Sequence, residues 1–469
     1  MPFDRMKKAA LKAKNCPLRP KYHFLPPANW INDPNGPIYY KGYYHLFYQH
    51  NPFGKGWNKI HWGHTKSKDL VHWERLPIAL SPSKELGEKH CFSGCSVIHE
   101  GIPTILYTSI NSPESIYLGA EQWIAFGSDD MISWKKYKNN PAMTGEIHGE
   151  LKIYEWRDPF LWKEGDIWFL VLCGLKRKPK QPIVLLYQSK DLKQWNFIGE
   201  LCIGDKKYRN IWECPNFFEL NDKHVLIVSS QERDSAELLG SRKTLYSIGK
   251  YESQKFSPKK WGIVDHGRRF YAPTTMRAPD NRVLMWGWIY AQGTQGWNGC
   301  LSLPRTLSLR TDNVLEFQPV SELKTLRTNH WNYDSIELNS GESSQIQYLS
   351  DMQFEIKLDL NVENVHIFNI ALVHPESSIA TKLIYFNKTA NCLSCYDNKV
   401  DLSSCNSPNN IKFHIFLDVS VFEIFFNKEI VISGQIDQDI KENKLIRIQA
   451  VDGSLSIDKI DIWKLKSIW

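Results

Sequence analysis

The feature that most constrains how this chain can fold is a seven-residue motif that recurs at a fixed interval. The motif reads Ser-x-Asp-(Leu/Met)-x-x-Trp and occupies residues 67–73, 128–134 and 189–195, so both steps are 61 residues long. Internal repetition at a fixed period indicates an architecture built from one repeated supersecondary unit.

A second feature follows the same interval and extends the repeat to five units. A polar or glycine turn precedes a short apolar run at Gly42, Gly101, Gly165, Asn221 and Asp280, with steps of 59, 64, 56 and 59 residues. A unit of about 60 residues accommodates a four-stranded antiparallel sheet with its loops. Radial repetition of such sheets forms a β-propeller, here with five blades. A linear array is the alternative, although the terminal units show no obvious capping pattern.

The last third of the chain differs in character. From about Trp331 tryptophan becomes rare, and alternating apolar runs follow, separated by Asn, Ser and Gly. This pattern is typical of a β-sandwich. The predicted fold is therefore all-β, a five-bladed β-propeller followed by a C-terminal β-sandwich. The expected parts are an N-terminal extension with a short helix (1–20), the propeller (21–318), a linker (319–332) and the sandwich (333–469).

Three carboxylates occupy the same place in the repeat. Asp33, Asp158 and Glu213 lie nine, seven and eight residues before the turns of the first, third and fourth units, and Phe92-Ser93 and Tyr271 take that place in the other two. Equivalent positions of propeller blades meet at the central channel. We therefore predict that the three carboxyl groups converge at one end of it. The alternative, that each inner strand simply begins with a polar residue, stays open at this point.

Three carboxylates at a channel mouth suit the cleavage of a glycosidic bond. A retaining mechanism requires a carboxylate nucleophile and a carboxylic acid about 5–5.5 Å apart. Asp33, flanked by amide side chains, fits an ionised nucleophile, whereas Glu213 lies in an apolar stretch that suits a general acid. The neighbouring Arg157 should keep Asp158 ionised, so that Asp158 can stabilise an oxocarbenium-like transition state.

A metal site is the competing interpretation, because three carboxylates can also hold Ca²⁺ or Mg²⁺. No other oxygen-rich loop accompanies them. The pair Cys392 and Cys395 lacks a second pair or a histidine cluster with zinc spacing. We therefore expect no metal and no cofactor.

Composition excludes several other classes of protein. The net charge of +7 is spread along the chain without basic runs interleaved with aromatics, which argues against nucleic acid. No apolar run approaches the length of a membrane span, about 18 residues or more, and residues 1–14 lack the apolar core of a secretory signal. The ten cysteines favour reduced thiols and a cytoplasmic setting; a leader missing from this sequence would instead indicate secretion.

These motifs resemble those of glycoside hydrolase family 32, the β-fructofuranosidases, which include invertases, inulinases and levanases. The resemblance covers nearly the whole chain. It rests on motifs in the family's order at residues 30–36 (Trp-Ile-Asn-Asp-Pro-Asn-Gly), 48–52, 61–64, 92–95, 157–159, 213–215 and 416–425. It implies that Asp33 is the nucleophile, Glu213 the acid/base and Asp158 the transition-state stabiliser.

The resemblance also implies a fructosyl subsite. With Tyr271, which shares the phase of the carboxylates, the expected substrate-binding residues are Asn32, Gln49, Trp57, Phe92, Ser93 and Arg157. The rings of Trp57 and Phe92 can pack on the apolar face of a sugar. Packing in the cores of the blades is the alternative for both.

The chain departs from the family pattern at four places. Cys95 replaces a usual Ser, and Val419 replaces Arg in the sandwich motif. Asn216 stands where many members have Asp, which should lower the pKa of the acid by removing a like charge. The pair Arg268-Arg269 places cations where many members have Asp and puts the leaving-group side in question.

The predicted function is retaining hydrolysis of β-fructofuranosides, with sucrose as the first candidate and a small-molecule or oligosaccharide fructoside as the partner. An exo-acting fructanase for inulin or levan is one alternative. Hydrolysis of sucrose 6-phosphate is another, in which Arg268 and Arg269 would meet the phosphate if they face the pocket. A non-catalytic sugar-binding propeller is the third, but binding alone does not require all three acids.

Overall fold

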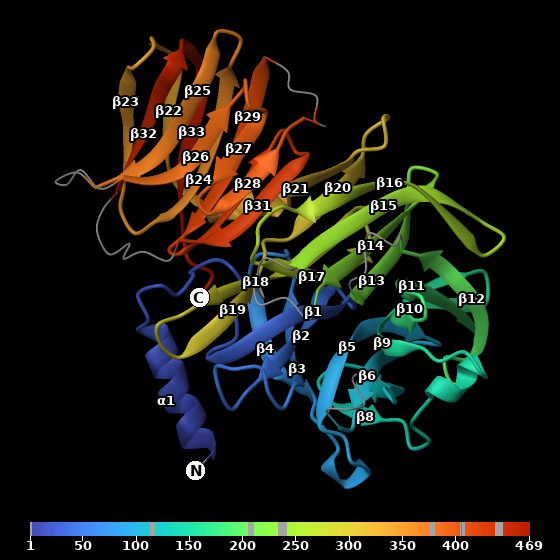
Figure 1. Ribbon diagram of the computed structural model, residues 1–469. Coiled ribbons are helices and arrows are strands. Elements are labelled where there is room, and N and C mark those ends of the chain that lie inside the picture. The colour runs from blue at the N-terminus through green and yellow to red at the C-terminus, as the bar shows by residue number, and fades with distance from the viewer. Residues whose placement is uncertain are drawn as a thin grey trace. The chain divides into compact units, whose positions relative to one another are not determined.

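The computed structural model describes residues 2–112, 118–204, 211–232, 242–374, 380–403, 405, 409–436 and 444–469, without the side chains of residues 2–6. The fold is all-β (Figure 1). In the described part of the chain, the helical segments are α1 (Pro2–Lys14) and the 3-10 turns η1 (Lys84–Leu86), η3 (Gly145–His148) and η4 (Ser321–Leu326). The helix α1 occupies most of the stretch for which the sequence predicts a short helix.

Three separate four-stranded antiparallel sheets follow one another in the chain. They comprise β5 (His90–His99), β6 (Ile102–Ile110), β7 (Glu121–Gly127) and β8 (Trp134–Lys136); β9 (Tyr154–Glu164), β10 (Ile167–Arg177), β11 (Lys180–Ser189) and β12 (Asn196–Ile203); and β13 (Ile211–Leu220), β14 (Lys223–Gln231), β15 (Arg242–Glu252) and β16 (Lys255–Asp265). Each sheet is a meander in which sequential strands pair, as the 60-residue period predicts.

Two further groups of four strands belong to one continuous sheet. The first group comprises β1 (Asn29–Tyr40), β2 (Tyr43–Asn51), β3 (His61–Ser67) and β4 (Trp73–Leu80), and the last comprises β17 (Phe270–Arg277), β18 (Val283–Gln292), β19 (Trp297–Leu301) and β20 (Arg305–Leu309). They join because β19 pairs in parallel with β1. The beginning and the end of the repeat region are thus linked by backbone hydrogen bonds.

The first strands of the five groups contact one another in a closed circle. The contacting pairs are β1 with β5, β5 with β9, β9 with β13, β13 with β17, and β17 with β1. Each of these strands also carries a β-bulge, at residues 31–34, 91–94, 157–160, 213–216 and 271–274. A bulge bends a strand and re-aims its side chains, so five strands that meet at one place all change direction at the same phase of the repeat.

The repeated motif forms the turn between the third and fourth strands. In the first copy, the Asp69 carboxylate accepts hydrogen bonds from two backbone N–H groups of the turn, at 2.8 and 3.0 Å. The indole N–H of Trp73 donates to the carbonyl of Leu70 at 3.1 Å, and Leu70 is buried with a φ of 64°. Such a φ is uncommon for a residue other than glycine. In 128–134 and 189–195 the aspartate again accepts a backbone N–H of the turn, and the indole N–H again donates to the carbonyl three residues earlier.

The remaining strands form two six-stranded sheets that share one hydrophobic core. One sheet comprises β22 (Arg327–Leu338), β33 (Leu455–Leu465), β24 (Gln353–Asn361), β29 (Asn410–Asp418), β30 (Val421–Phe426) and β31 (Ile430–Gln435). The other comprises β23 (Ser343–Leu349), β32 (Lys444–Gly453), β25 (Val365–Val373), β26 (Ala380–Asn387), β27 (Cys392–Cys395) and β28 (Asn398–Asp401). A short strand, β21 (Leu315–Pro319), precedes them.

The chain divides into two compact units. The first comprises residues 1–14, 25–264 and 270–315, and the second comprises 15–24, 265–269 and 316–469. Two short segments, 15–24 and 265–269, therefore belong with the C-terminal strands, although they lie within the ranges predicted for the extension and the propeller. The strand β22 begins at Arg327, inside the range predicted as linker.

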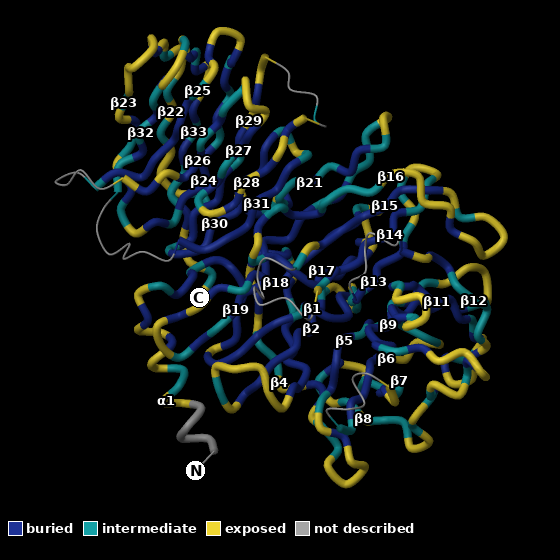
Figure 2. Tube along the Cα trace, in the orientation of Figure 1, coloured by how far each residue is buried: buried dark blue, intermediate teal, exposed yellow. Residues whose placement is uncertain are grey.

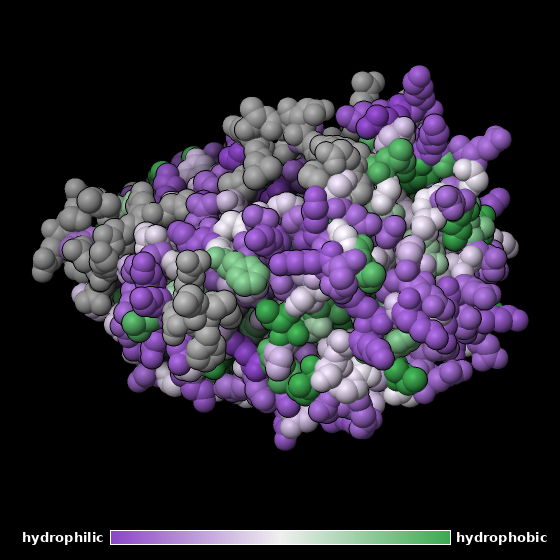
Figure 3. All heavy atoms as spheres, turned by 90° about the horizontal axis from the view of Figure 1, so that it is seen from below, coloured by the Kyte–Doolittle hydropathy of each residue, from purple (hydrophilic) through white to green (hydrophobic). Residues whose placement is uncertain are grey.

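Burial follows the strands. Figure 2 shows the strands mostly buried and the connecting turns exposed. The face shown in Figure 3 is mainly hydrophilic, with hydrophobic atoms in small separate groups. In the described part of the chain, no helix combines the length and the apolar composition needed to cross a membrane.

Candidate active site

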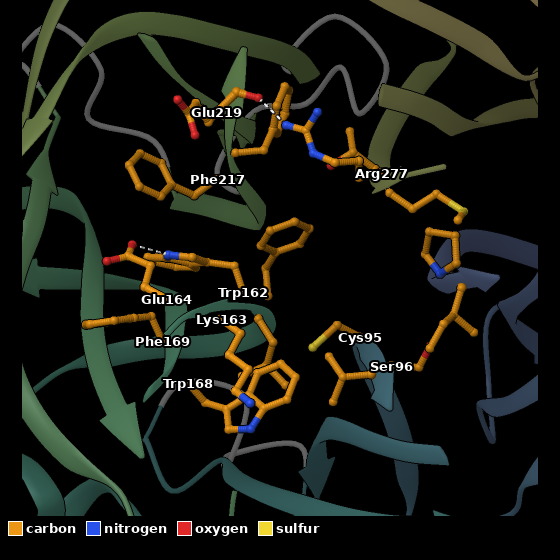
Figure 4. Close-up of a pocket in the computed structure, with 18 of the residues that line it drawn as sticks. Cys95, Ser96, Trp162, Lys163, Glu164, Trp168, Phe169, Phe217, Glu219 and Arg277 are labelled. Carbon is orange, nitrogen blue, oxygen red and sulfur yellow. Dashed lines mark hydrogen bonds between the residues drawn. The ribbon is translucent and has the colours of Figure 1, made fainter. Parts of the chain in front are cut away.

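Two cavities lie among the inner strands of the first unit. The larger has a volume of about 1100 Å³ and is lined by aromatic side chains, among them Trp162, Phe169 and Phe217. Figure 4 shows two contacts among its lining residues: Trp162 donates to Glu164 at 2.6 Å, and Arg277 donates to the backbone carbonyl of Glu219 at 2.6 Å. None of the residues predicted to act in catalysis or substrate binding is among the described residues that line this cavity.

The smaller cavity, of about 350 Å³, brings the predicted residues together. It is lined by Asn32, Asp33, Gln49, Trp57, Phe92, Arg157, Asp158, Glu213 and Tyr271, nine of the ten predicted residues. The predicted convergence of the three carboxylates is therefore confirmed. The tenth residue, Ser93, is 3% exposed and lies behind Asp33, where it positions that carboxylate rather than lining the cavity.

Asp33 is held by donors on both of its oxygens. The Asn32 amide donates to Oδ1 at 3.0 Å, and the Ser93 hydroxyl donates to Oδ2 at 2.5 Å. Gln49 links these donors, since its Oε1 accepts from Asn32 at 2.7 Å and its Nε2 donates to the Ser93 oxygen at 2.5 Å. Burial raises the pKa of Asp33, while these hydrogen bonds oppose the shift and the nearby Glu213 adds to it. The network fixes the orientation of the carboxylate.

Glu213 is flanked by a cation and a hydroxyl group. Arg157 Nη2 lies 2.7 Å from Oε1, and the Tyr271 hydroxyl donates to Oε2 at 2.5 Å. Arg157 also donates to Glu155 at 2.5 Å. The Glu213 side chain is 18% exposed. In contrast to the apolar surroundings expected from its sequence neighbours, the carboxyl group thus has polar partners on β9 and β17.

Asp158 differs from its sequence-based expectation. Its Oδ2 accepts from the Cys214 backbone N–H at 3.0 Å, and Arg157 Nε is 3.8 Å away. Burial nevertheless raises the pKa of Asp158 to about 7; Arg157 opposes this shift, and the charges of Glu213 and Asp33 add to it. Arg157 favours the ionised form of Asp158, as expected, but desolvation outweighs this single cation, which is shared with two other carboxylates.

The bulges place several of these residues. Asp158 and Cys214 each precede a proline within a bulge, with φ values of 66° and 50°. A residue before proline avoids the right-handed helical region, and a positive φ turns its side chain away from the direction that a regular strand would give. The Cys214 thiol consequently lies 3.5 Å from Asp33 Oδ2 and 3.7 Å from Asp158 Oδ2. Burial raises the pKa of this thiol, so it remains a neutral donor between two acids.

The sequence analysis missed six residues that line the cavity: Trp30, Cys214, Gln231, Arg242, Trp288 and Tyr290. Trp30 and Cys214 lie inside motifs that were identified, so their positions offered a signal. Trp288 and Tyr290 are on β18, outside the inner strands. Gln231 and Arg242 face each other at the adjoining ends of β14 and β15, and no motif marks them.

The structure gives the local contacts of two of the departures from the family pattern, Asn216 and the pair Arg268-Arg269. The amide of Asn216 donates to the carbonyls of Cys214 and Pro273, and its oxygen accepts from Thr275, so Asn216 joins β13 to β17. The Arg268 backbone N–H donates to the Asn398 side chain. Neither Arg268 nor Arg269 is among the residues that line the cavity, and both belong to the second unit, so their contact with a phosphate group stays a prediction.

Metal coordination has no candidate cluster in the described part of the chain. No group of three or more His, Cys, Asp and Glu side chains there has an arrangement that could hold a metal ion. Among the described residues, the guanidinium of Arg157 forms ion pairs with Glu155, Asp158 and Glu213.

Comparisons with known proteins agree on one family. The model of the glycosyl hydrolases family 32 N-terminal domain matches residues 23–319, and that of the family 32 C-terminal domain matches residues 322–464. A sucrose-6-phosphate hydrolase of Zymomonas mobilis is 34% identical, over 99% of this chain and 95% of its own length. A levanase of Bacillus subtilis is 30% identical, over 96% of this chain and 71% of its own length.

Solved structures give the same result. A family 32 β-fructofuranosidase of Bombyx mori superposes with a TM-score of 0.82 at 27% identity, over 99% of this chain and 98% of that chain. A sucrose-6-phosphate hydrolase of Lactobacillus gasseri superposes with a TM-score of 0.84 at 26% identity, over 100% of this chain and 97% of that chain.

Proposed function

The chain belongs to glycoside hydrolase family 32, and from that premise we propose that it is a retaining β-fructofuranosidase that releases fructose from sucrose and related fructosides. The observation that carries the proposal is the convergence of Asp33, Asp158 and Glu213 on one cavity, each with different partners. A retaining glycosidase needs two carboxyl groups with different tasks.

In the first step, Asp33 attacks the anomeric carbon of the fructosyl group while Glu213 gives its proton to the departing oxygen. A fructosyl-enzyme ester and the leaving sugar result. In the second step, Glu213 takes a proton from water, which attacks the same carbon and releases fructose and the Asp33 carboxylate. The donors on both oxygens of Asp33 support its role, because they hold the carboxylate in one orientation.

Arg157 and Tyr271 serve the acid/base. Both contact Glu213, so they hold it in place and stabilise the charge that it acquires after it gives up its proton. Asp158 acts as the transition-state stabiliser in its ionised form, with hydrogen bonds to sugar hydroxyls. The acids lie close enough to titrate as a unit, which agrees with the raised pKa of Asp158.

Aromatic side chains supply the apolar contacts of the subsite. Trp57 is 44% exposed and stacks on His90 with ring centroids 4.9 Å apart, and Phe92 meets its edge at 5.8 Å. Trp30 and Trp288 form a second group on the cavity wall, with centroids 5.5 Å apart. Such rings can cover the apolar face of a sugar while its hydroxyls meet the acids.

We also propose that the repeat region is a five-bladed β-propeller and that the two six-stranded sheets form a β-sandwich. The closed circle of first strands and the parallel pair of β1 with β19 support the propeller. The shared core of the two sheets supports the sandwich. The cytoplasmic setting stays a prediction, which fractionation of the source cells would test.

The test is a panel of fructosides: sucrose, sucrose 6-phosphate, inulin and levan, with fructose release followed by chromatography. Transfer of the fructosyl group to methanol reports the stereochemistry, and a retaining enzyme gives the methyl β-fructofuranoside. The Asp33→Ala variant is the control for contaminating activity. Binding of these sugars without fructose release would support the non-catalytic alternative, and an α-configured product would contradict the retaining mechanism.

A further inference from the structure

Arg242 differs from the other arginine of the cavity. It opens β15 and faces Gln231 across the sheet, and both line the cavity that holds the three acids. Its guanidinium carbon lies 5.1 Å from the ring centroid of Tyr271 and 5.5 Å from that of Trp288. Because Tyr271 donates to Glu213, Arg242 lies on the side of the cavity where the acid/base works.

Within the described part of the chain, no carboxylate forms an ion pair with Arg242, and its buried Nε has no hydrogen-bond partner. Arg157, by contrast, contacts Glu155, Asp158 and Glu213. A partly buried guanidinium loses hydration without a hydrogen-bonding partner to replace it. The two aromatic rings compensate in part through cation–π contacts, but the buried Nε–H stays without an acceptor.

We propose that Arg242, assisted by Gln231, binds a phosphate group on the leaving-group sugar and thereby makes phosphorylated substrates the preferred ones. The inference rests on the proposed function, since the leaving group must lie beside Glu213 to receive its proton. Arg242 thereby takes the phosphate-binding role that the sequence suggested for Arg268 and Arg269.

Charge explains why the cavity needs this residue. Asp33, Asp158, Glu155 and Glu213 are close together, so a phosphate that enters with the substrate meets like charges that repel it. A guanidinium offers a planar pair of donors that match two phosphate oxygens. A neutral glucosyl or fructosyl leaving group offers only hydroxyl oxygens, which attract the guanidinium more weakly than two charged phosphate oxygens do.

A positioning role is the competing explanation, because Arg242 also contacts Tyr271. If Arg242 only held Tyr271 and Glu213 in place, its loss would slow the first step for every leaving group alike. If it binds phosphate, its loss slows the reaction for phosphorylated substrates alone. The ratio of kcat/KM for two substrates separates these cases.

The experiment compares sucrose 6-phosphate with sucrose in the wild type, in Arg242→Gln and in Arg277→Gln, an exposed arginine beside the larger cavity. We expect Arg242→Gln to lower kcat/KM for sucrose 6-phosphate by about 10- to 100-fold and that for sucrose by less than about threefold, as expected for loss of one charge-assisted contact. Arg277→Gln should change neither. An equal loss on both substrates, or an unchanged ratio, would overturn the inference.

Product inhibition gives a second readout. Glucose 6-phosphate should inhibit sucrose hydrolysis by the wild type more strongly than glucose does, and Arg242→Gln should abolish the difference. If the wild type hydrolyses sucrose but shows neither a preference for phosphate nor this inhibition, the inference fails and the proposed function stands. If the wild type hydrolyses no fructoside, the proposed function itself fails.

Discussion

The three acids of the cavity are of the same chemical kind, yet their partners assign them different tasks. Asp33 receives hydrogen bonds from neutral donors, Glu213 contacts a guanidinium and a phenol, and Asp158 receives a backbone N–H. Neutral donors orient a nucleophile without changing its charge. The cation and the hydroxyl group beside Glu213 stabilise its ionised form and hold the carboxyl group in place in both protonation states of an acid/base.

Substitution of Asp33 and of Glu213 should therefore affect activity in different ways. Asp33→Ala should abolish turnover for every leaving group. Glu213→Ala should lose about 10²–10⁴-fold on sucrose but keep much of its first step on fructosyl fluoride, whose leaving group needs no proton. Its second step is then slow, so mass spectrometry of the quenched variant should detect a fructosyl adduct on Asp33. An equal response of both variants to leaving-group acidity would contradict these roles.

Asn216 gives a residue-scale prediction about stability. Its amide donates to two backbone carbonyls, and the side chain is 2% exposed. In Asn216→Asp both carbonyls lose their donor and face a buried carboxylate, so the variant should lose about 2–4 kcal/mol of unfolding free energy. Urea denaturation measures the loss. Asn139→Asp, at an exposed side chain whose amide donates to the Tyr137 hydroxyl, is the control and should change stability far less.

At the scale of elements, two local devices build the repeat region. The bulge in each first strand sets where the side chains of the cavity point. The seven-residue motif sets the turn from the third strand to the fourth through an aspartate that accepts backbone hydrogen bonds. An aspartate that caps its own turn favours that local conformation before any tertiary contact forms.

The motif predicts a measurable contribution of its aspartate to stability. Asp69→Ala removes the acceptor of two backbone N–H groups and of the Ser67 hydroxyl, so we expect a loss of about 1 kcal/mol. Asp129→Ala is the matched control, because Asp129 forms an exposed ion pair with Lys41 and such pairs contribute little. Thermal denaturation of both variants is the measurement; equal melting temperatures would contradict the role of the motif.

At the scale of the whole molecule, a buried charged cluster within the second unit joins parts of the chain that are distant in sequence. His23 Nδ1 lies 2.8 Å from Asp418 and Nε2 lies 3.0 Å from Glu423, and all three side chains are fully buried. The backbone N–H groups of Lys21, Tyr22 and His23 also donate to Asp418. The cluster thus ties residues 15–24 to the hairpin of β29 and β30.

This cluster predicts that stability falls at alkaline pH. Burial alone would lower the pKa of His23, but its bonds to Asp418 and Glu423 outweigh burial and raise the pKa to about 9. A raised histidine pKa stabilises the fold fully below the unfolded value, about 6.5, and the contribution is lost as pH rises through the folded value. Between about pH 7.5 and pH 9.5 the second unit should lose about 2 kcal/mol.

Calorimetry across this pH range tests the prediction, and the window lies above the pKa of Asp158, about 7, which limits interference from that group. His23→Gln should remove the pH dependence, whereas His72→Gln, at a half-exposed side chain, should keep it. If His23→Gln does not fold, NMR titration of His23 in the wild type decides, and a histidine pKa near 6.5 would contradict the argument.

Removal of metal ions should leave activity unchanged, because a retaining carboxylate pair needs no cation and Arg157 supplies positive charge at the acids. The measurement is sucrose hydrolysis after exhaustive dialysis against EDTA, compared with a sample dialysed at equal ionic strength. Activity that is lost and then restored by Ca²⁺ or Mg²⁺ would support a metal site instead.

The features that the sequence by itself determined are those made by short-range contacts or by a regular period. The turn motif was readable because each of its contacts spans three residues, Asp69 with His72 and Leu70 with Trp73. The convergence of Asp33, Asp158 and Glu213 was readable from their shared phase, since identical units place equivalent residues at equivalent points. Sequence motifs also carried the family resemblance across both units.

The tertiary structure alone decided which groups share a charge and which are dehydrated. Arg157 adjoins Asp158 in sequence, yet its closer partner is Glu213, 56 residues away, and burial raises the pKa of Asp158 in spite of its neighbour. Arg242 and His23 carry no motif that marks their surroundings. Desolvation and Coulomb interactions depend on every atom nearby in space, and the bulges and long-range strand pairs that bring those atoms together leave no fixed spacing in the sequence.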